Sequence, residues 1–263
     1  MDLMLGGKVV LLVGAGGGIA AALTKELKQE GAFVALCLPE TGGEACGEDE
    51  FFRCDLADEA EAEWLRAALM KRFGRLDAVV FGQTGAEKAG LFELDAGGFQ
   101  NRMVPARAAF LCCKVFGQCI GDQGRGGAIL FLTSIHDEKP SGSDFAHSLV
   151  QGMISNLVME AALQYGELGV RVNQISAGAM EGDQERFPSD LTTLYEGCQY
   201  KVPAGRLGKA QDIAPLAAFL LSDRASFVNG VRVRADGGFL LHYIDHKANL
   251  RAIKAAGEVA SHG

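Results

Sequence analysis

The stretch Val13-Gly14-Ala15-Gly16-Gly17-Gly18-Ile19-Ala20 decides how this chain is interpreted. It joins the apolar run 8–13 to a segment, 19–30, whose apolar residues recur at helical spacing. Glycines between a buried strand and a helix let the backbone turn tightly and approach a diphosphate, which then meets the N-terminus of the helix. The stretch therefore predicts a strand, a nucleotide-binding turn and a helix, with simple packing of helix against sheet as the alternative role. The candidate nucleotide contacts in it are Gly14, Gly18 and Ile19.

The rest of the chain repeats this alternation of apolar strands and helical patterns. We expect further strands at 33–38, 77–81, 128–132, 170–175 and 231–234, and further helices at 59–73, 99–120, 145–165 and 210–221. Pro105 must either kink the helix at 99–120 or lie near its start. Continuous apolar strands that alternate with helices indicate a parallel sheet covered on both faces. The predicted fold class is α/β, with a single Rossmann-type, doubly wound parallel sheet in one domain over residues 1–263.

Two segments do not follow this alternation. The connection 180–203 is long and polar, and we expect it to form a lid over a pocket. The C-terminal tail, 242–263, has a weak helical pattern. It either packs on a neighbouring chain or has no fixed structure.

The composition excludes several classes of protein. The formal net charge of the 263 residues is −8, and an acidic chain without a basic run is a poor candidate for binding nucleic acid or an anionic membrane. The sequence has neither an apolar run of about 20 residues that predicts a membrane span nor the basic start of a secretory signal. Its seven cysteines are scattered and form no CxxC pair. We therefore expect a cytoplasmic protein with reduced thiols and no metal site.

Motifs in the second half of the chain resemble those of short-chain dehydrogenases/reductases. Gly169-Val170-Arg171-Val172-Asn173 is similar to the strand that follows the family's catalytic helix, and Asp236-Gly237-Gly238 is similar to the family's last strand signature. The glycine turn is similar as well, with Val13 in place of the family's Thr and Ala20 in place of its last Gly. Asp55 matches the acid that the family places beside the adenine. The resemblance covers nearly the whole chain and implies the same Rossmann fold.

The resemblance also implies a catalytic tetrad of Asn, Ser, Tyr and Lys, and this chain departs from it. Counting along the motifs puts His147 at the Tyr position and Gln151 at the Lys position, one helical turn apart. Ser134 keeps the Ser position, and Pro105 stands at the Asn position. In the family the lysine lowers the pKa of the tyrosine and holds the nicotinamide ribose. Because three of the four positions are replaced, the sequence assigns no catalytic residue with the family's role.

The nucleotide side of the predicted site departs from the family too. The strand at 33–38 ends in Leu38-Pro39, where the family has an Asp or a following Arg that binds the ribose. The family's Asn-Asn-Ala-Gly turn is replaced by Phe81-Gly82-Gln83-Thr84, and we expect Phe81 to crowd the adenosine. These replacements predict that this chain binds no cofactor itself, with NAD(P) as the alternative.

The helix predicted at 145–165 is apolar over more than half of its circumference, which indicates burial on two sides. The resemblance implies that this helix and the one at 99–120 form a dimer interface. An apolar interface beside a replaced tetrad favours a non-catalytic subunit of a heteromeric NAD-dependent dehydrogenase. Its partner would be a homologous active subunit or a second copy of the chain. Heteromers with one degenerate subunit occur in the family, as in anaerobic toluene degradation.

Two other functions stay open. Histidine exchanges protons near neutral pH without a neighbouring lysine. Ser134 and His147 therefore fit an atypical site of an NAD(P)-dependent oxidoreductase. The same residues, as nucleophile and base, also fit a non-redox dehydratase, isomerase or hydrolase.

Overall fold

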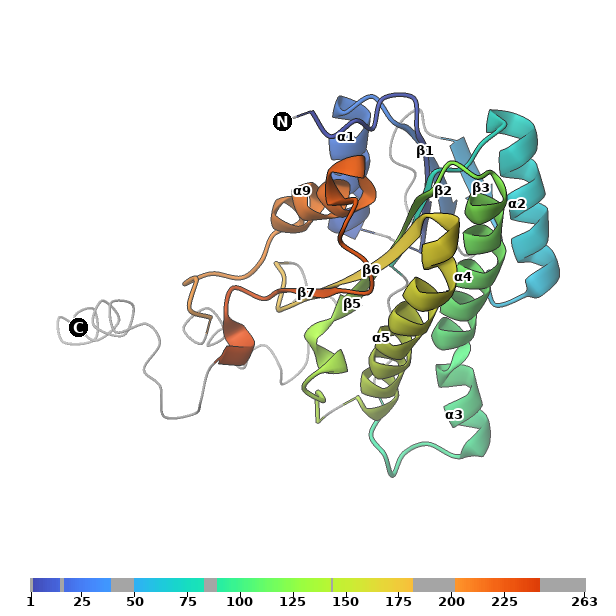
Figure 1. The fold of residues 1–263 in the computed structure, drawn as a ribbon. Helices are drawn as coiled ribbons and strands as arrows, with labels where there is room; N and C mark the ends of the chain where they lie inside the picture. The colour runs from blue at the N-terminus through green and yellow to red at the C-terminus, as the bar shows by residue number, and fades with distance from the viewer. Residues whose placement is uncertain are drawn as a thin grey trace.

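A computed structural model of the chain describes residues 2–14, 17–38, 50–82, 89–142, 144–181 and 202–241. The strands pair in parallel and form one seven-stranded sheet with the order β3-β2-β1-β4-β5-β6-β7 (Figure 1). The strand order reverses between β1 and β4, and sheets of this kind bind ligands in the crevice beyond the carboxyl ends of the strands at such a point. The predicted α/β class is confirmed. The strands are β1 (Val9–Val13), β2 (Phe33–Leu38), β3 (Glu50–Arg53), β4 (Ala78–Phe81), β5 (Gly127–Ser134), β6 (Val170–Ala177) and β7 (Arg232–Ala235).

Helices cover both faces of the sheet, because the central strands β1 and β4 bury apolar side chains on both sides. On one face, α1 (Gly17–Gln29) packs beside α9 (Ala210–Leu221). On the other face lie α2 (Glu59–Phe73), α4 (Val104–Asp122) and α5 (Phe145–Tyr165) (Figure 1). Short 3-10 helices follow several elements: η1 (Ile135–Asp137), η2 (Gly166–Leu168), η3 (Asp223–Ala225) and η4 (Phe239–Leu241).

The helix predicted at 99–120 is in fact two helices. The first, α3 (Ala96–Arg102), ends at Met103, and α4 begins at Val104 with Pro105 in its first turn. Proline is tolerated there because the backbone N–H groups of the first turn have no partner within the helix. The short strand β3 was not predicted. Together, α3 and α4 (Ala96–Asp122) are apolar and long enough to span a membrane, but 61% of their most apolar window is buried inside the fold, as in a core helix.

Two predictions fall largely outside the described residues. Most of the predicted lid, from 182 to 201, is not described, and neither is the tail, 242–263. The prediction of one domain over residues 1–263 likewise stays a prediction.

Candidate active site

The candidate site lies at the carboxyl ends of β5 and β6, beside the N-terminus of α5. Ser134 is the last residue of β5, and its backbone N–H donates a hydrogen bond of 2.9 Å to Oε1 of Gln151 on α5. The structure therefore brings together two of the four predicted positions. Gln151 is only 5% exposed. The lysine that holds a ribose in the family donates hydrogen bonds. The carbonyl oxygen of Gln151 can only accept, and it already accepts the bond from Ser134, so it cannot replace that lysine.

Two histidine rings meet next to Ser134. His136, in η1, lies against His147, in the first turn of α5, with 5.5 Å between ring centroids and an angle of 79° between ring planes. Nδ1 of His136 is 3.0 Å from the carbonyl oxygen of Lys139. A carbonyl can only accept, so Nδ1 carries the proton and Nε2 is the acceptor of the neutral ring. His136 was missed in the sequence, although a histidine two residues after Ser134 at a strand end was a usable signal.

The two remaining neighbours of the site have structural roles. Asp144 caps α5, because its Oδ1 accepts a hydrogen bond of 3.1 Å from the backbone N–H of His147. Asp144 is thus the N-cap of the helix that carries His147. Pro105 lies half-buried in the first turn of α4. A proline ring has no donor or acceptor, so it cannot supply the hydrogen bonds of the family's asparagine.

The described residues on either side of the middle of the glycine turn have backbone angles that favour glycine. Gly14 and Gly17 have φ angles of 60° and 72°, in the left-handed region that favours glycine. Gly17 begins α1, a helix of 13 residues whose N-terminus attracts a phosphate. A Cβ at Gly18 would lie 3.6 Å from Cβ of Ala210 on α9, so this glycine also lies where two helices pack closely. Ile19 is half-buried, and residues 15 and 16 lie outside the described residues.

On the adenosine side of the site, the chain has the predicted Asp55 but has Leu38 where the family has a polar residue. Asp55 is exposed, and its Oδ1 accepts a hydrogen bond of 2.9 Å from the backbone N–H of Ala57. Leu38 is half-buried at the end of β2 and offers a ribose no polar atom. Asp55 thus lies on the surface, and its contact with the adenine stays a prediction.

The prediction that Phe81 crowds the adenosine is wrong. Phe81 is only 1% exposed and packs in the core against Phe131, with 5.7 Å between ring centroids. Phe81 and Phe131 lie side by side on neighbouring β4 and β5, in the core on the face of the sheet that α4 and α5 cover. This replacement therefore places no exposed aromatic ring at the end of β4.

The buried cysteines are core residues. Cys37 and Cys54, at the ends of neighbouring strands, have their sulfur atoms 3.6 Å apart. The hydrogen bond with Cys54, together with burial, raises the pKa of the Cys37 thiol well above its usual range. Burial raises the pKa of Cys113 to about 12. Thiols held neutral in this way are poor nucleophiles, so Cys37 and Cys113 are not candidates for the chemistry of the site.

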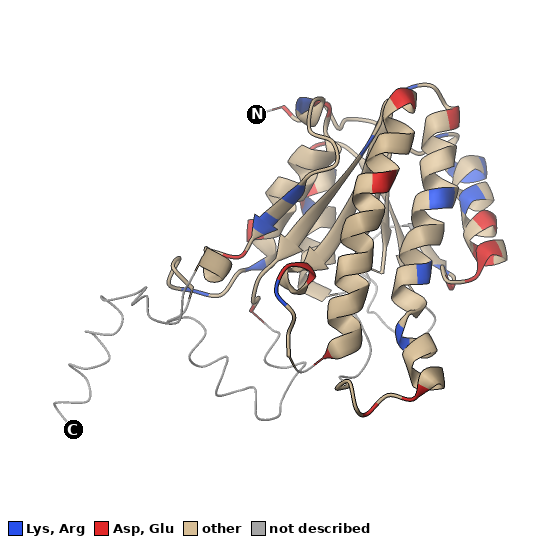
Figure 2. Cartoon of the chain, turned by 60° about the horizontal axis from the view of Figure 1, so that its bottom comes forward, with Lys and Arg blue, Asp and Glu red and all other residues tan. Residues whose placement is uncertain are grey.

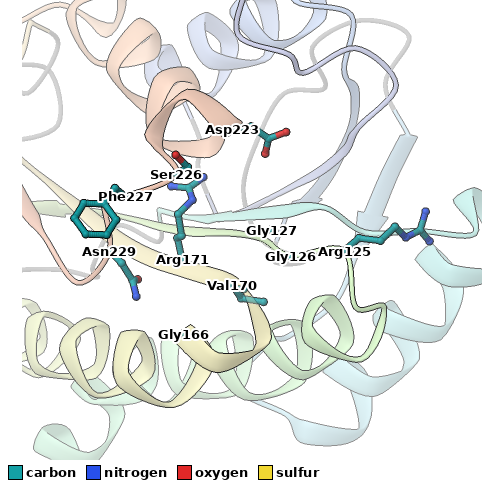
Figure 3. A pocket seen from close by; sticks show the side chains of 11 residues that line it. Arg125, Gly126, Gly127, Gly166, Val170, Arg171, Asp223, Ser226, Phe227 and Asn229 are labelled. Atoms are coloured by element: carbon teal, nitrogen blue, oxygen red, sulfur yellow. The ribbon is translucent and has the colours of Figure 1, made fainter.

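A cavity of about 500 Å³ lies at the opposite end of the sheet, at the amino ends of β5 and β6 (Figure 3). Arg171 lines it, but its guanidinium donates to the carbonyl oxygens of Leu220 and Ser222, which closes the end of α9. Asp223, also in its lining, pairs with Lys8 at 2.6 Å. These groups hold the framework together, so the cavity is not a second candidate for the catalytic centre.

Comparison with known proteins gives the family. Residues 14–240 match the family model described as enoyl-(acyl carrier protein) reductase. The chain is also 31% identical over 245 residues to 2,5-dichloro-2,5-cyclohexadiene-1,4-diol dehydrogenase of Sphingobium indicum, covering 89% of this chain and 98% of that protein. The chain belongs to the short-chain dehydrogenase/reductase family.

Two further relatives are a dehydrogenase and a reductase by name. Cis-4-hydroxycyclohexanecarboxylate dehydrogenase of Sinomonas cyclohexanicum is 32% identical over 248 residues, covering 88% of this chain and 96% of that protein. The crystal structure of levodione reductase is similar with a TM-score of 0.80 at 28% identity, covering 90% of this chain and 99% of that one. The relatives are oxidoreductases by name, and they give no support to a degenerate or inactive subunit.

Proposed function

We propose that the chain is an NAD(P)-dependent oxidoreductase that interconverts a secondary alcohol on a six-membered ring and its ketone, with an atypical site of Ser134, His136 and His147. The observation that carries the proposal is the contact between the imidazole rings of His136 and His147 at the carboxyl end of β5, where the Ser134 hydroxyl accepts a hydrogen bond of 3.4 Å from the backbone N–H of His136. The relatives named for cyclohexane-type alcohols support the substrate class.

The chain's own residues can supply the proton chemistry of this reaction. The Ser134 hydroxyl can hydrogen-bond to the alcohol oxygen, and Nε2 of His136 can accept the hydroxyl proton. His147, edge-on to His136, can stabilise the resulting imidazolium or pass the proton outward. Two imidazoles thus replace the tyrosine and lysine, because histidine needs no cationic neighbour to exchange protons near neutral pH.

The described residues fit the diphosphate of a nicotinamide dinucleotide better than they fit its two riboses. Gly14, Gly17 and the N-terminus of α1 would hold the diphosphate, and Asp55 would contact the adenine. When bound, the nicotinamide ring takes up or gives the hydride. Leu38 and Gln151 offer the two riboses less than the family's residues do. We therefore expect weak binding, with no strong choice between NAD and NADP.

Isothermal titration of the purified chain with NAD(H) and NADP(H) tests the proposal. We expect saturable binding of at least one nucleotide, and weaker binding in Gly17→Val, which strains a left-handed backbone position at the start of α1. The matched control is Gly152→Ala, because an added Cβ there meets nothing within 4 Å. Absence of binding at millimolar nucleotide would contradict the oxidoreductase proposal.

A second candidate function is a non-catalytic subunit that pairs with an active homologous subunit or with itself. An uncovered apolar face of α5 favours it: α5 carries a single Lys, Arg, Asp or Glu along its length, Glu160 (Figure 2). Leu163 is 76% exposed, and Met153 and Met159 are 51% exposed each. Side chains of this kind usually lie in an interface. This candidate shares the cytoplasmic location and the lack of nucleic acid or membrane partners that the sequence predicts.

Native mass spectrometry of the chain, alone and co-expressed with a short-chain dehydrogenase/reductase that has an intact tetrad, separates the two candidates. An active, nucleotide-binding homo-oligomer supports the oxidoreductase. A mixed oligomer in which only the intact subunit binds nucleotide supports the subunit role. Leu163→Lys should weaken either assembly. Trp64→Lys, which changes an exposed side chain on α2, should not.

A further inference from the structure

The buried carboxylate of Asp137 connects η1, α5 and β6, the first two of which carry the histidine pair. Asp137 ends η1, one residue after His136, and its side chain is 0% exposed. Its Oδ2 accepts hydrogen bonds from Nε2 of Gln174 at 2.6 Å, from the Ser176 hydroxyl at 2.7 Å and from the Ser155 hydroxyl at 3.0 Å. Gln174 and Ser176 lie on β6, and Ser155 lies on α5. The position of η1 is thus fixed to both the sheet and the helix that carries His147.

The edge strand β7 holds the same turn from the outside. Nη1 of Arg232 is 3.5 Å from Oδ2 of Asp137, and its Nη2 is 3.3 Å from Glu138. Arg234, two residues on and therefore on the same face of the strand, pairs with Glu138 at 2.9 Å. The arginines and Glu138 are partly exposed, so these pairs are individually weak. Their common effect is to limit the movement of η1 away from the sheet.

Stability alone does not account for this arrangement. Oδ1 of Asp137 and Oε1 of Gln174 are buried and have no hydrogen-bond partner among the described residues. A buried acceptor without a donor destabilises the fold. An apolar contact of the same volume would hold η1 at lower energetic cost, since buried ionic groups are often less stable than their apolar replacements. The arrangement instead specifies one position for the turn.

We propose that Asp137 is a positioning residue of the site, which keeps the ring of His136 against the ring of His147. Asp137 does not itself touch the substrate or a cofactor. It fixes η1 to α5 and β6, and the two imidazoles follow because η1 carries one and α5 carries the other. This inference rests on the proposed function, because the distance between the rings affects a reaction only if they exchange protons.

The direct test is NMR spectroscopy of the histidine side chains in the full chain without ligand, so that it requires no turnover. In the wild type we expect proton–proton contacts between the rings of His136 and His147. Asp137→Ala should remove them while the protein stays folded by circular dichroism. Asp137→Asn should keep them, because its amide oxygen can still accept the hydrogen bonds from Ser155, Ser176 and Gln174.

The control is Asp223→Asn, which removes an ion pair with Lys8 at the other end of the sheet and should leave the ring contacts unchanged. Ring contacts that persist in Asp137→Ala, or that are lost equally in Asp223→Asn, overturn the inference. If Asp137→Ala does not fold, Ser155→Ala removes one donor and should shift the His136 resonances. Unchanged resonances in that variant overturn it equally.

Turnover separates a failure of this inference from a failure of the proposed function. If the wild type is active, Asp137→Ala should lower kcat at least 10-fold with little change in KM, and Asp137→Asn should restore most of it. Unchanged kcat in Asp137→Ala leaves the proposed function standing and refutes the positioning role. If the wild type is inactive, the proposed function fails, and the ring contacts alone decide whether Asp137 positions the pair.

Discussion

The two ends of the sheet differ in what determines their residues. At the amino ends of β5 and β6, backbone packs on backbone: a Cβ at Gly126 would lie 2.8 Å from the carbonyl oxygen of Gly169, and one at Gly127 would collide with the carbonyl oxygen of Asp77. At the carboxyl ends, Ser134 is hydrogen-bonded to Gln151 and to His136, and the ring of His136 contacts the ring of His147. Close packing limits the residue types at the amino ends, whereas hydrogen bonds and ring contacts between side chains distinguish the carboxyl ends.

This difference explains how the chain keeps the family's fold while it departs from the family's tetrad. The amino end retains the motif Gly169-Val170-Arg171-Val172-Asn173, in which Arg171 closes the end of α9 and the Asn173 side chain donates to the carbonyl oxygen of Val228. Replacement there would lose the fold. Replacement at the carboxyl end changes the hydrogen bonds and ring contacts around Ser134, and the chain still forms the seven-stranded sheet.

The largest effect should follow from an added methyl group at the amino end. Gly127→Ala places Cβ against the carbonyl oxygen of Asp77 and the side chain of Ile120. We expect it to lower the free energy of unfolding by about 3 kcal/mol. Gly152→Ala is the matched change near the site, and it should raise that free energy by up to about 1 kcal/mol because alanine favours a helix. Urea denaturation measures both, and equal effects would contradict the comparison.

A smaller effect should follow from truncation at the carboxyl end. Gln151→Ala leaves the backbone N–H of Ser134 without its acceptor. We expect a loss of about 1–2 kcal/mol in the free energy of unfolding. Hydrogen exchange should show faster exchange of the Ser134 amide, and an unchanged exchange rate would mean that another group accepts this bond.

The smallest effect should be a pH dependence of the stability of the fold, caused by Tyr165. Burial raises the pKa of Tyr165 to about 12, and its hydroxyl donates to the carbonyl oxygen of Cys113 at 3.1 Å. The unfolded phenol ionises near its ordinary pKa of about 10. The contribution of Tyr165 to stability is therefore complete below pH 10 and is lost progressively as the pH rises toward 12. Tyr165→Phe should show a weaker loss of stability in this range, followed by thermal unfolding at several pH values.

The sequence predicts the framework better than the site, for physical reasons. The bounds of β2, α2, α5 and α9 match the predictions. The direction of Phe81 was mistaken because β4 is buried on both faces, and a continuous apolar strand carries no signal for which face a side chain takes. His136 and Asp137 were missed because their roles depend on a three-residue turn that brings distant elements together.

The most direct test of the account is the oxidation of a cyclohexanol-type secondary alcohol, followed by nucleotide reduction at 340 nm, for the wild type, His147→Ala and His136→Ala. The account predicts turnover by the wild type and a loss of at least about 100-fold in kcat for each variant. Turnover that survives both changes would contradict the histidine site. Absence of turnover and of nucleotide binding in the wild type would contradict the oxidoreductase function and favour the subunit role.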